Sequence, residues 1–251
     1  MKNPPSPRNW FDEGGRAYAR FRPEYPSDLV DFLASLTPQT RLAVDVGCGN
    51  GQLTRLLSAS YDAVIGLDPS ADQISHASQD ERITYLRAPA EQLPLDPHSA
   101  DLITAAQAAH WFNLPAFYQE VRRVGVQGGV LALISYGVLE LEAGLNDRFQ
   151  EFYWNEIGPY WPPERRLVDE GYAGIDFPFE PLPAPVMHIE LEWHLTEFLG
   201  YLLTWSAVRH AKEAGHSTIL MRFADDLAAA WGDSNQRRSI RWPLNMRIGK
   251  I

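Results

Sequence analysis

The chain has 251 residues, of which 45% are hydrophobic and 22% are charged, which is ordinary for a globular chain with a large core. Its formal net charge of -10 at pH 7 argues against nucleic acids and anionic membranes as partners, because the averaged field repels phosphate groups. The single cysteine, Cys48, excludes an intramolecular disulfide and a metal cluster held by cysteines.

The two ends of the chain bear on targeting and on binding to nucleic acid. Residues 1–8 are polar and proline-rich and lack the apolar core of a signal peptide. No apolar run approaches the roughly 18 residues that a membrane helix needs, so we expect a cytoplasmic protein. Arginines cluster near the end, at Arg237, Arg238, Arg241 and Arg247. They alternate with apolar residues, which favours a strand with one solvated side over a nucleic-acid surface.

Residues 42–136 alternate apolar bursts with polar, helix-like stretches, which is typical of a parallel sheet with crossover helices. The predicted strands are 42–46, 63–67, 83–86, 101–105 and 130–135. The predicted helices between them are 52–58, 71–78 and 116–124. Pro94 and Pro97 argue against a helix in the segment 89–99. Five strand–helix units are therefore expected.

The sequence changes character after residue 137, where it becomes rich in aromatic residues and prolines. We interpret residues 138–185 as an insert that forms a helical lid. Beyond it the spacing of apolar residues predicts further elements. These are a strand over 186–193, helices over 195–211 and 219–231, and a closing strand over 240–248.

The strongest motif is the glycine-rich run 44–51, which stands where the first predicted strand ends and a helix begins. Its glycines, Gly47, Gly49 and Gly51, allow a sharp turn and let a ligand approach without meeting a β-carbon. The first amides of the following helix would face the same crevice. The run therefore predicts a ligand site at the end of the first strand.

Two carboxylates accompany the glycines and help to identify the ligand. A nicotinamide or flavin dinucleotide site needs a third glycine where this chain has Gln52, and Asp45 would repel a pyrophosphate. Asp45 suits a ligand with a cationic amino group. Asp68, at the end of the second strand, can accept hydrogen bonds from both ribose hydroxyls of an adenosine. The alternative is that both aspartates merely cap strands or helices.

These residues resemble the motifs of class I S-adenosylmethionine-dependent methyltransferases, and residues 11–136 look like the small-molecule branch of that family. The trans-aconitate-type enzymes and the methyltransferases of ubiquinone and menaquinone biosynthesis are the most similar. The resemblance implies S-adenosylmethionine as cofactor and a small-molecule methyl acceptor. It also implies an α/β fold with a Rossmann-like, seven-stranded, mostly parallel sheet, helices on both faces and an antiparallel last strand. Tyr18 would lie near the methionine carboxylate of the cofactor, with Arg22 close by.

Two later segments extend this resemblance. The run 88–94 is similar to the family's G-D-A-E-x-L-P, with Pro89 in place of the aspartate that often receives the adenine amino group. Adenine recognition would then fall to the Ala90 amide and to Glu91, unless Glu91 is a solvated helix residue. The run 105–112 resembles Q-A-x-H-W and implies that Gln107 lies beside the methionine portion of the cofactor.

His110 and Trp111 would face the transferable methyl group or the acceptor, although a buried structural histidine is the alternative. His110 is the candidate general base if the acceptor is a carbon acid, a phenol or an amine, whereas a carboxylate needs no base. A carboxylate acceptor would instead call for arginines, for which Arg22, Arg165, Arg166 and Arg209 are available by type. Aromatic residues could roof the acceptor site or simply pack the lid: Tyr136, Tyr153, Trp154, Tyr160, Trp161 and Trp205.

The sequence thus predicts one methyltransferase domain over 1–251. Its parts are a cofactor-covering segment (1–40), a cofactor-binding core (41–137), the lid (138–185) and a final part that completes the sheet (186–251). The expected reaction is methyl transfer to a small molecule, on a carboxylate or phenol oxygen, with no metal. A binding or regulatory protein of the same fold, or an NAD-dependent oxidoreductase, is the alternative. The oligomeric state stays open.

Overall fold

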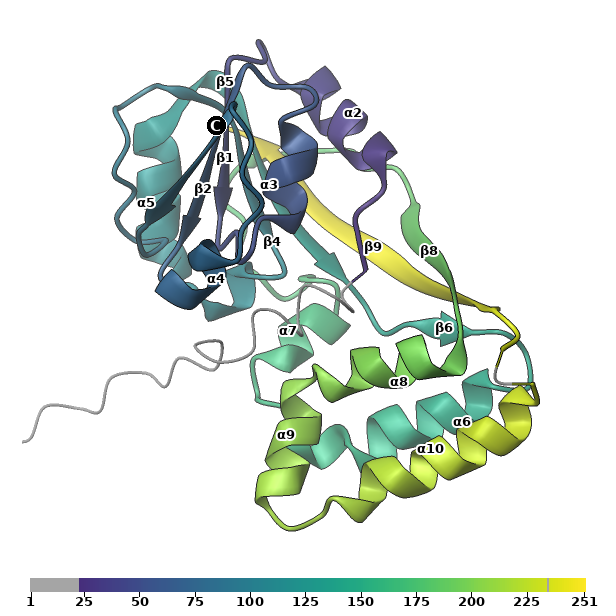
Figure 1. The fold of residues 1–251 in the computed structure, drawn as a ribbon. Coiled ribbons are helices and arrows are strands. Elements are labelled where there is room, and N and C mark those ends of the chain that lie inside the picture. Colours follow the sequence, from purple (N-terminus) through teal and green to yellow (C-terminus); the bar gives the residue numbers. More distant parts are fainter. Residues whose placement is uncertain (1–22, 234) are drawn as a thin grey trace, which may run out of the picture.

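The centre of the structure is a twisted, mostly parallel sheet (Figure 1). The structure, a computed structural model, describes residues 23–233 and 235–251. The strands are β1 (Leu42–Val46), β2 (Ala63–Asp68), β3 (Ile83–Arg87), β4 (Ala100–Ala106), β5 (Gly125–Tyr136), β6 (Glu140–Leu141), β7 (Glu180–Leu182), β8 (Met187–Trp193) and β9 (Arg238–Lys250). Their order is β3-β2-β1-β4-β5-β9-β6, with β7 and β8 also paired to β9.

The five predicted strands of the first half are confirmed as β1 to β5. Neighbouring strands among them pair in parallel, and β9 pairs antiparallel with β5, as the family resemblance implied. β4 lies between β1 and β5 and is buried along all but its last residue. Its mostly apolar sequence, interrupted only by the buried Asp101 and Thr104, is typical of a parallel strand covered on both faces.

The prediction of seven strands is wrong, because the described residues form nine. β5 and β7 both pair with residues 248–250 of β9, so they lie on opposite flanks of that strand. β6 and β8 both pair with residues 240–241, and β5 and β8 both pair with Leu244, so β5 and β6 share one flank while β7 and β8 share the other. Pro183 and Pro185 explain the break between β7 and β8, since proline cannot donate to a strand ladder.

Helices cover both faces of the sheet and continue beyond one end of it. They are α2 (Ser27–Leu36), α3 (Gln52–Leu57), α4 (Ala71–Ser75), α5 (Leu114–Val124), α6 (Asn146–Glu151), α7 (Arg165–Asp169), α8 (Leu195–Leu203), α9 (Ser206–Glu213) and α10 (Thr218–Trp231). In Figure 1, α5 lies on one side of the sheet, and α2 and α3 lie on the other. Ala43 of β1 packs in the same cluster as Leu33 of α2, whereas the next residue, Val44, packs with Phe117 of α5. The alternation of one strand therefore serves two cores.

A second group of helices, α6 and α8 to α10, lies beyond one end of the sheet (Figure 1). Their shared core is aromatic, and the rings of Phe152 and Phe223 stack with centroids 4.0 Å apart. Because α8 to α10 come from residues after 185, the helical part extends beyond the predicted insert 138–185. The predicted helix 195–211 is also broken, since Trp205 adopts an extended conformation that separates α8 from α9.

The arginine cluster near the end of the chain is engaged within the protein. Arg238 pairs with Glu142 at 3.0 Å and Arg241 with Glu190 at 3.3 Å. Arg247 donates to the carbonyl oxygen of Ala173 at 3.1 Å. Of the helices in the described part of the chain, none is both long enough and apolar enough to cross a membrane.

Candidate functional site

Three glycines shape the turn between β1 and α3. Gly47, Gly49 and Gly51 have φ angles of +71°, +56° and +86°, in the left-handed region that favours glycine. The amides of Gly47 and Cys48 donate to the carbonyl oxygen of Leu67, at 2.7 and 3.0 Å. The turn is therefore folded over the end of β2, beside β1 in the sheet.

Asp45 lies beneath this turn and is only 1% exposed. Its Oδ2 accepts a hydrogen bond from the Thr54 hydroxyl at 2.7 Å, and its Oδ1 accepts one from the Thr104 hydroxyl at 2.8 Å. Burial raises the pKa of the Asp45 carboxyl to about 6. Asp45 thus ties β1 to α3 and β4. These contacts favour support of the turn, and contact with a ligand's amino group stays a prediction.

Asp68 closes the crevice from the end of β2. Its Oδ2 accepts from the Gly49 amide at 2.9 Å, and its Oδ1 accepts from the Ser70 amide at 2.8 Å. These contacts fix the orientation of the Asp68 carboxylate. The carboxylate and the glycine turn are therefore held together at the same edge of the sheet.

The segment after β3 forms a loop, as Pro94 and Pro97 predicted. Ala88 donates its amide to the carbonyl oxygen of Asp68 at 3.2 Å, which brings the loop to the end of β2. Ala90 is buried, and Glu91 accepts a hydrogen bond from the Asn113 amide at 2.8 Å. Glu91 therefore lies in a turn, not in a helix, and it fixes the residue that precedes α5.

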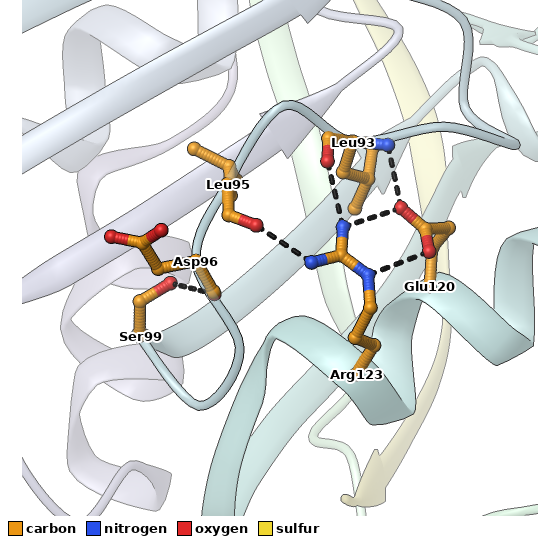
Figure 2. A network of polar contacts seen from close by, with 6 residues as sticks. All are labelled: Leu93, Leu95, Asp96, Ser99, Glu120 and Arg123. Carbon is orange, nitrogen blue, oxygen red and sulfur yellow. Dashed lines mark hydrogen bonds and ion pairs between the residues drawn. The ribbon is translucent and has the colours of Figure 1, made fainter.

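Arg123 of α5 holds the second half of this loop (Figure 2). Its Nη2 and Nη1 donate to the carbonyl oxygens of Leu93 and Leu95, both at 2.7 Å. Glu120 accepts from the Leu93 amide at 2.7 Å and pairs with Nη2 of Arg123 at 2.6 Å. The three contacts to Leu93 and Leu95 hold the loop in place of regular backbone hydrogen bonds, and the Arg123–Glu120 pair orients both side chains toward it.

Replacing Arg123 by alanine is expected to lower the free energy of unfolding by about 2 kcal/mol, because several charge-assisted hydrogen bonds are lost from a partly exposed site. Urea denaturation measures this. Arg82→Ala is the control, because Arg82 is 48% exposed and makes only a 4.0 Å ion pair with Asp80. Equal unfolding free energies for the two variants would contradict the role given to Arg123.

Gln107 follows β4 with a φ of +53°, a conformation that is uncommon for residues other than glycine. Its amide donates to the carbonyl oxygen of Ile134 at 2.8 Å, and its Nε2 donates to that of Tyr136 at 3.0 Å. Both partners belong to β5. A strained residue held in this way at the carboxyl ends of parallel strands is typical of a binding site.

His110 lies in a short 3-10 helix, Ala109–Trp111, and contacts a residue from far along the chain. Its Nδ1 lies 3.0 Å from the hydroxyl of Tyr172, a fully buried residue with a φ of +61°. Burial, and to a lesser extent the charge of Arg165, lower the pKa of His110 to about 3. The imidazole is therefore neutral at pH 7 and a weak proton acceptor.

The contact with the Tyr172 hydroxyl bears on which imidazole nitrogen carries the proton. Burial raises the pKa of Tyr172, so the phenol keeps its proton and can donate it to Nδ1 of His110. A neutral imidazole that accepts at Nδ1 carries its proton on Nε2. His110 then offers a donor at Nε2, which favours hydrogen bonding to a ligand over the predicted role of general base.

Arg165 opens α7, which packs against the 3-10 helix that carries His110. Its Nε donates to Oδ1 of Asp169 at 2.9 Å and to the hydroxyl of Tyr153 at 3.0 Å. Its guanidinium lies 4.7 Å from the ring centroid of Trp161. Only 17% of the Arg165 side chain is exposed. The structure thus brings one of the four predicted arginines to the neighbourhood of His110.

Of the other predicted arginines, Arg166 is turned to solvent: its side chain is 80% exposed and pairs with Glu170. Arg209 lies on α9 and is partly buried. Tyr18 and Arg22 lie outside the described residues, so their positions beside the cofactor stay predictions.

The predicted aromatic roof is divided between core and surface. Tyr136, Tyr153 and Trp205 are at most 4% exposed, and the rings of Trp161 and Trp205 have centroids 5.2 Å apart. Trp154, by contrast, is 51% exposed. These aromatic residues therefore link the helical group to the surroundings of Arg165, and Trp154 packs edge-to-face on Tyr153 at the exposed margin of the cluster.

Three residues of this site were not predicted from the sequence. Tyr172 gave no signal except that it follows a glycine, and nothing indicated that Thr54 and Thr104 would hold Asp45. In the described ranges, no group of three or more histidine, cysteine, aspartate and glutamate side chains is placed to hold a metal ion. Burial raises the pKa of the Cys48 thiol, which makes it unreactive.

Comparison with known proteins identifies the family to which the chain belongs. Residues 44–133 match the family described as "Methyltransferase domain". The chain is 34% identical to a Dictyostelium discoideum protein named as a methyltransferase, over 98% of this chain and 97% of the relative. It is 30% identical to a Saccharomyces cerevisiae protein named as S-adenosylmethionine-dependent, over 62% and 58%. A solved structure of a type II methyltransferase from Anaeromyxobacter dehalogenans shares 40% identity with a TM-score of 0.86, over 92% of this chain and 98% of that one.

Proposed function

Since the chain belongs to the class I S-adenosylmethionine-dependent methyltransferases, we propose that it methylates an oxygen atom, carboxylate or phenol, of a small-molecule acceptor. The bound cofactor supplies an electrophilic methyl group on a sulfonium. The protein then has to position the acceptor, and positioning alone can contribute on the order of 7–11 kcal/mol. The observation that carries the proposal is the arrangement of Asp68, Gln107 and His110 around the carboxyl ends of β2 and β4.

The residues present fit the cofactor. The three glycines of the turn have no β-carbon to obstruct an adenosine, and the Asp68 carboxylate stands beside them as the proposed acceptor for ribose hydroxyls. In this proposal Gln107 lies beside the methionine portion, and Asp45 acts by holding the turn. The full proposed set is Tyr18, Asp45, Gly47, Gly49, Gly51, Asp68, Ala90, Glu91 and Gln107.

An oxygen acceptor suits the properties of His110. A neutral imidazole with a pKa of about 3 cannot take up a proton efficiently at pH 7. It can donate a hydrogen bond from Nε2 and so orient an acceptor that is already ionised. A carboxylate meets this condition at neutral pH without help, and an acidic phenol meets it in part.

Labelled methyl transfer tests the proposed function. The purified protein is incubated with methyl-labelled S-adenosylmethionine and with small carboxylic acids and phenols as candidate acceptors. We expect label in small-molecule product, with a methyl ester released by mild base and a phenyl ether resistant to it. Label found on nitrogen, on carbon or in macromolecules would overturn the assignment to oxygen.

Replacing His110 by alanine is expected to slow turnover by roughly 10- to 100-fold, because one orienting hydrogen bond is lost. Affinity for S-adenosylhomocysteine should change little. His110→Gln keeps an N–H donor and is expected to retain more activity than His110→Ala. The pH profile of turnover should also show no inflection near pH 6.5, because His110 stays neutral there. Wild-type turnover in both variants would remove His110 from the site.

A further inference from the structure

The guanidinium of Arg165 is largely enclosed by the protein. In the described part of the chain, only one of its three nitrogens donates a hydrogen bond. Nε makes both hydrogen bonds, to Asp169 and Tyr153. Among the residues that the structure describes, Nη1 and Nη2 have no hydrogen-bond partner, and both keep some contact with solvent. A guanidinium held in place through Nε while its outer edge is open is arranged to receive a ligand.

The position of Arg165 relates this open edge to the acceptor region. Burial chiefly, and the charge of Arg165 to a lesser extent, lower the pKa of His110, so the guanidinium lies near the pair that His110 forms with Tyr172. α7 also packs directly against that 3-10 helix. Arg165 is therefore adjacent to the group that we propose to contact the acceptor.

The surroundings favour one kind of ligand. The two outer nitrogens of a guanidinium match the two oxygens of a carboxylate, and the aromatic rings of Trp161 and Tyr153 limit screening by water. Asp169, whose Oδ1 accepts from Arg165 and from Tyr153, leaves the cluster without excess positive charge. A phosphate dianion would be opposed by Asp169 more strongly than a carboxylate monoanion.

We propose that Arg165 binds a carboxylate group of the acceptor that is separate from the oxygen receiving the methyl group. An oxygen that accepts charge-assisted hydrogen bonds is a poorer nucleophile, so the carboxylate at Arg165 serves as an anchor. The acceptor is then a small acid with a second oxygen function, either another carboxylate or a phenol. This inference rests on the proposed function, because it places a substrate group relative to His110.

Binding of matched probes tests the inference. The protein is saturated with S-adenosylhomocysteine and titrated calorimetrically with 4-hydroxyphenylacetate, 4-hydroxycinnamate, succinate and glutarate, each paired with its uncharged primary amide or diamide. We expect one or more acids to bind about 10- to 100-fold more tightly than the matching amide, as expected for a charge-assisted contact. Arg165→Gln should abolish that preference by weakening the acid and not the amide, and Arg165→Lys should restore it only in part.

Arg166→Gln is the matched control, since Arg166 is the next residue on α7 but is 80% exposed. It should leave the preference for acids unchanged. Equal binding of acids and amides, no binding of any acid, or a preference retained in Arg165→Gln would each overturn the proposal. Methylation of oxygen in the labelled assay is scored separately. A protein that methylates an oxygen but shows no preference for acids would keep the proposed function and lose this inference.

Discussion

Replacing Asp68 by alanine is expected to weaken the binding of S-adenosylmethionine by about 100-fold or more. Two hydrogen bonds from ribose hydroxyls to a charged acceptor contribute roughly 1.5–3 kcal/mol each. The variant also releases the amides of Gly49 and Ser70, so the glycine turn loses its anchor at β2. Calorimetric titration with S-adenosylmethionine and S-adenosylhomocysteine measures the effect.

Asp62→Ala provides the matched control for this titration. Asp62 is exposed and lies immediately before β2, at the opposite end of the strand from Asp68. The Asp62→Ala variant should bind the cofactor with wild-type affinity. An Asp68→Ala variant that folds normally and binds with wild-type affinity would show that Asp68 only supports the turn.

Replacing Gly51 by alanine is expected to lower the free energy of unfolding by about 3–5 kcal/mol, because two costs add. The residue has a φ of +86°, which strains any side chain. Its β-carbon would lie 2.1 Å from the hydroxyl oxygen of Tyr85 and 2.9 Å from the ring carbon that bears it. Tyr85 cannot simply withdraw, since its ring also fills the space beside Gly66.

Gly128→Ala separates the two costs in the same denaturation experiment. Gly128 has a similar φ of +76°, but a β-carbon there would meet nothing within 4 Å. It should therefore lose only the strain term, about 1–2 kcal/mol. If both variants lose the same amount, the contact with Tyr85 has no energetic weight. Tyr85→Phe alone should be close to neutral, because its buried hydroxyl has no hydrogen-bond partner among the described residues.

The strands of the first half were predictable because each is a short apolar run that ends at a glycine, an aspartate or a polar turn. β4 and β5 are buried on both faces, and such burial leaves an unambiguous pattern. The pairing of two strands with each flank of β9 was not predictable. They depend on which residues of one long strand meet which partner, and pairing between distant segments leaves no local signal.

The position of the candidate site was predictable where its residues stand at the ends of those strands. The placement of the glycines, Asp68 and Gln107 at one edge of the sheet follows from strand ends and motif spacing, and their contact with the cofactor stays a proposal. The environment of His110 does not follow from such signals, because it depends on Tyr172, which lies 62 positions later in the chain. The burial of Arg165 was not predictable either, because its type suggested a role but only the packing of α7 places it beside the 3-10 helix of His110. Sequence indicated the candidates, and long-range packing distinguished among them.

The pairing of β5 with β9 has a consequence for how the chain reaches its native state. The two strands are separated by on the order of 100 residues, so a long loop must close before either gains its partner. Until then the apolar edge of β5 is exposed to other chains. Refolding should accordingly be slow and sensitive to protein concentration, with soluble yield falling as concentration rises. A chaperone that shields an unpaired strand edge would act at this step.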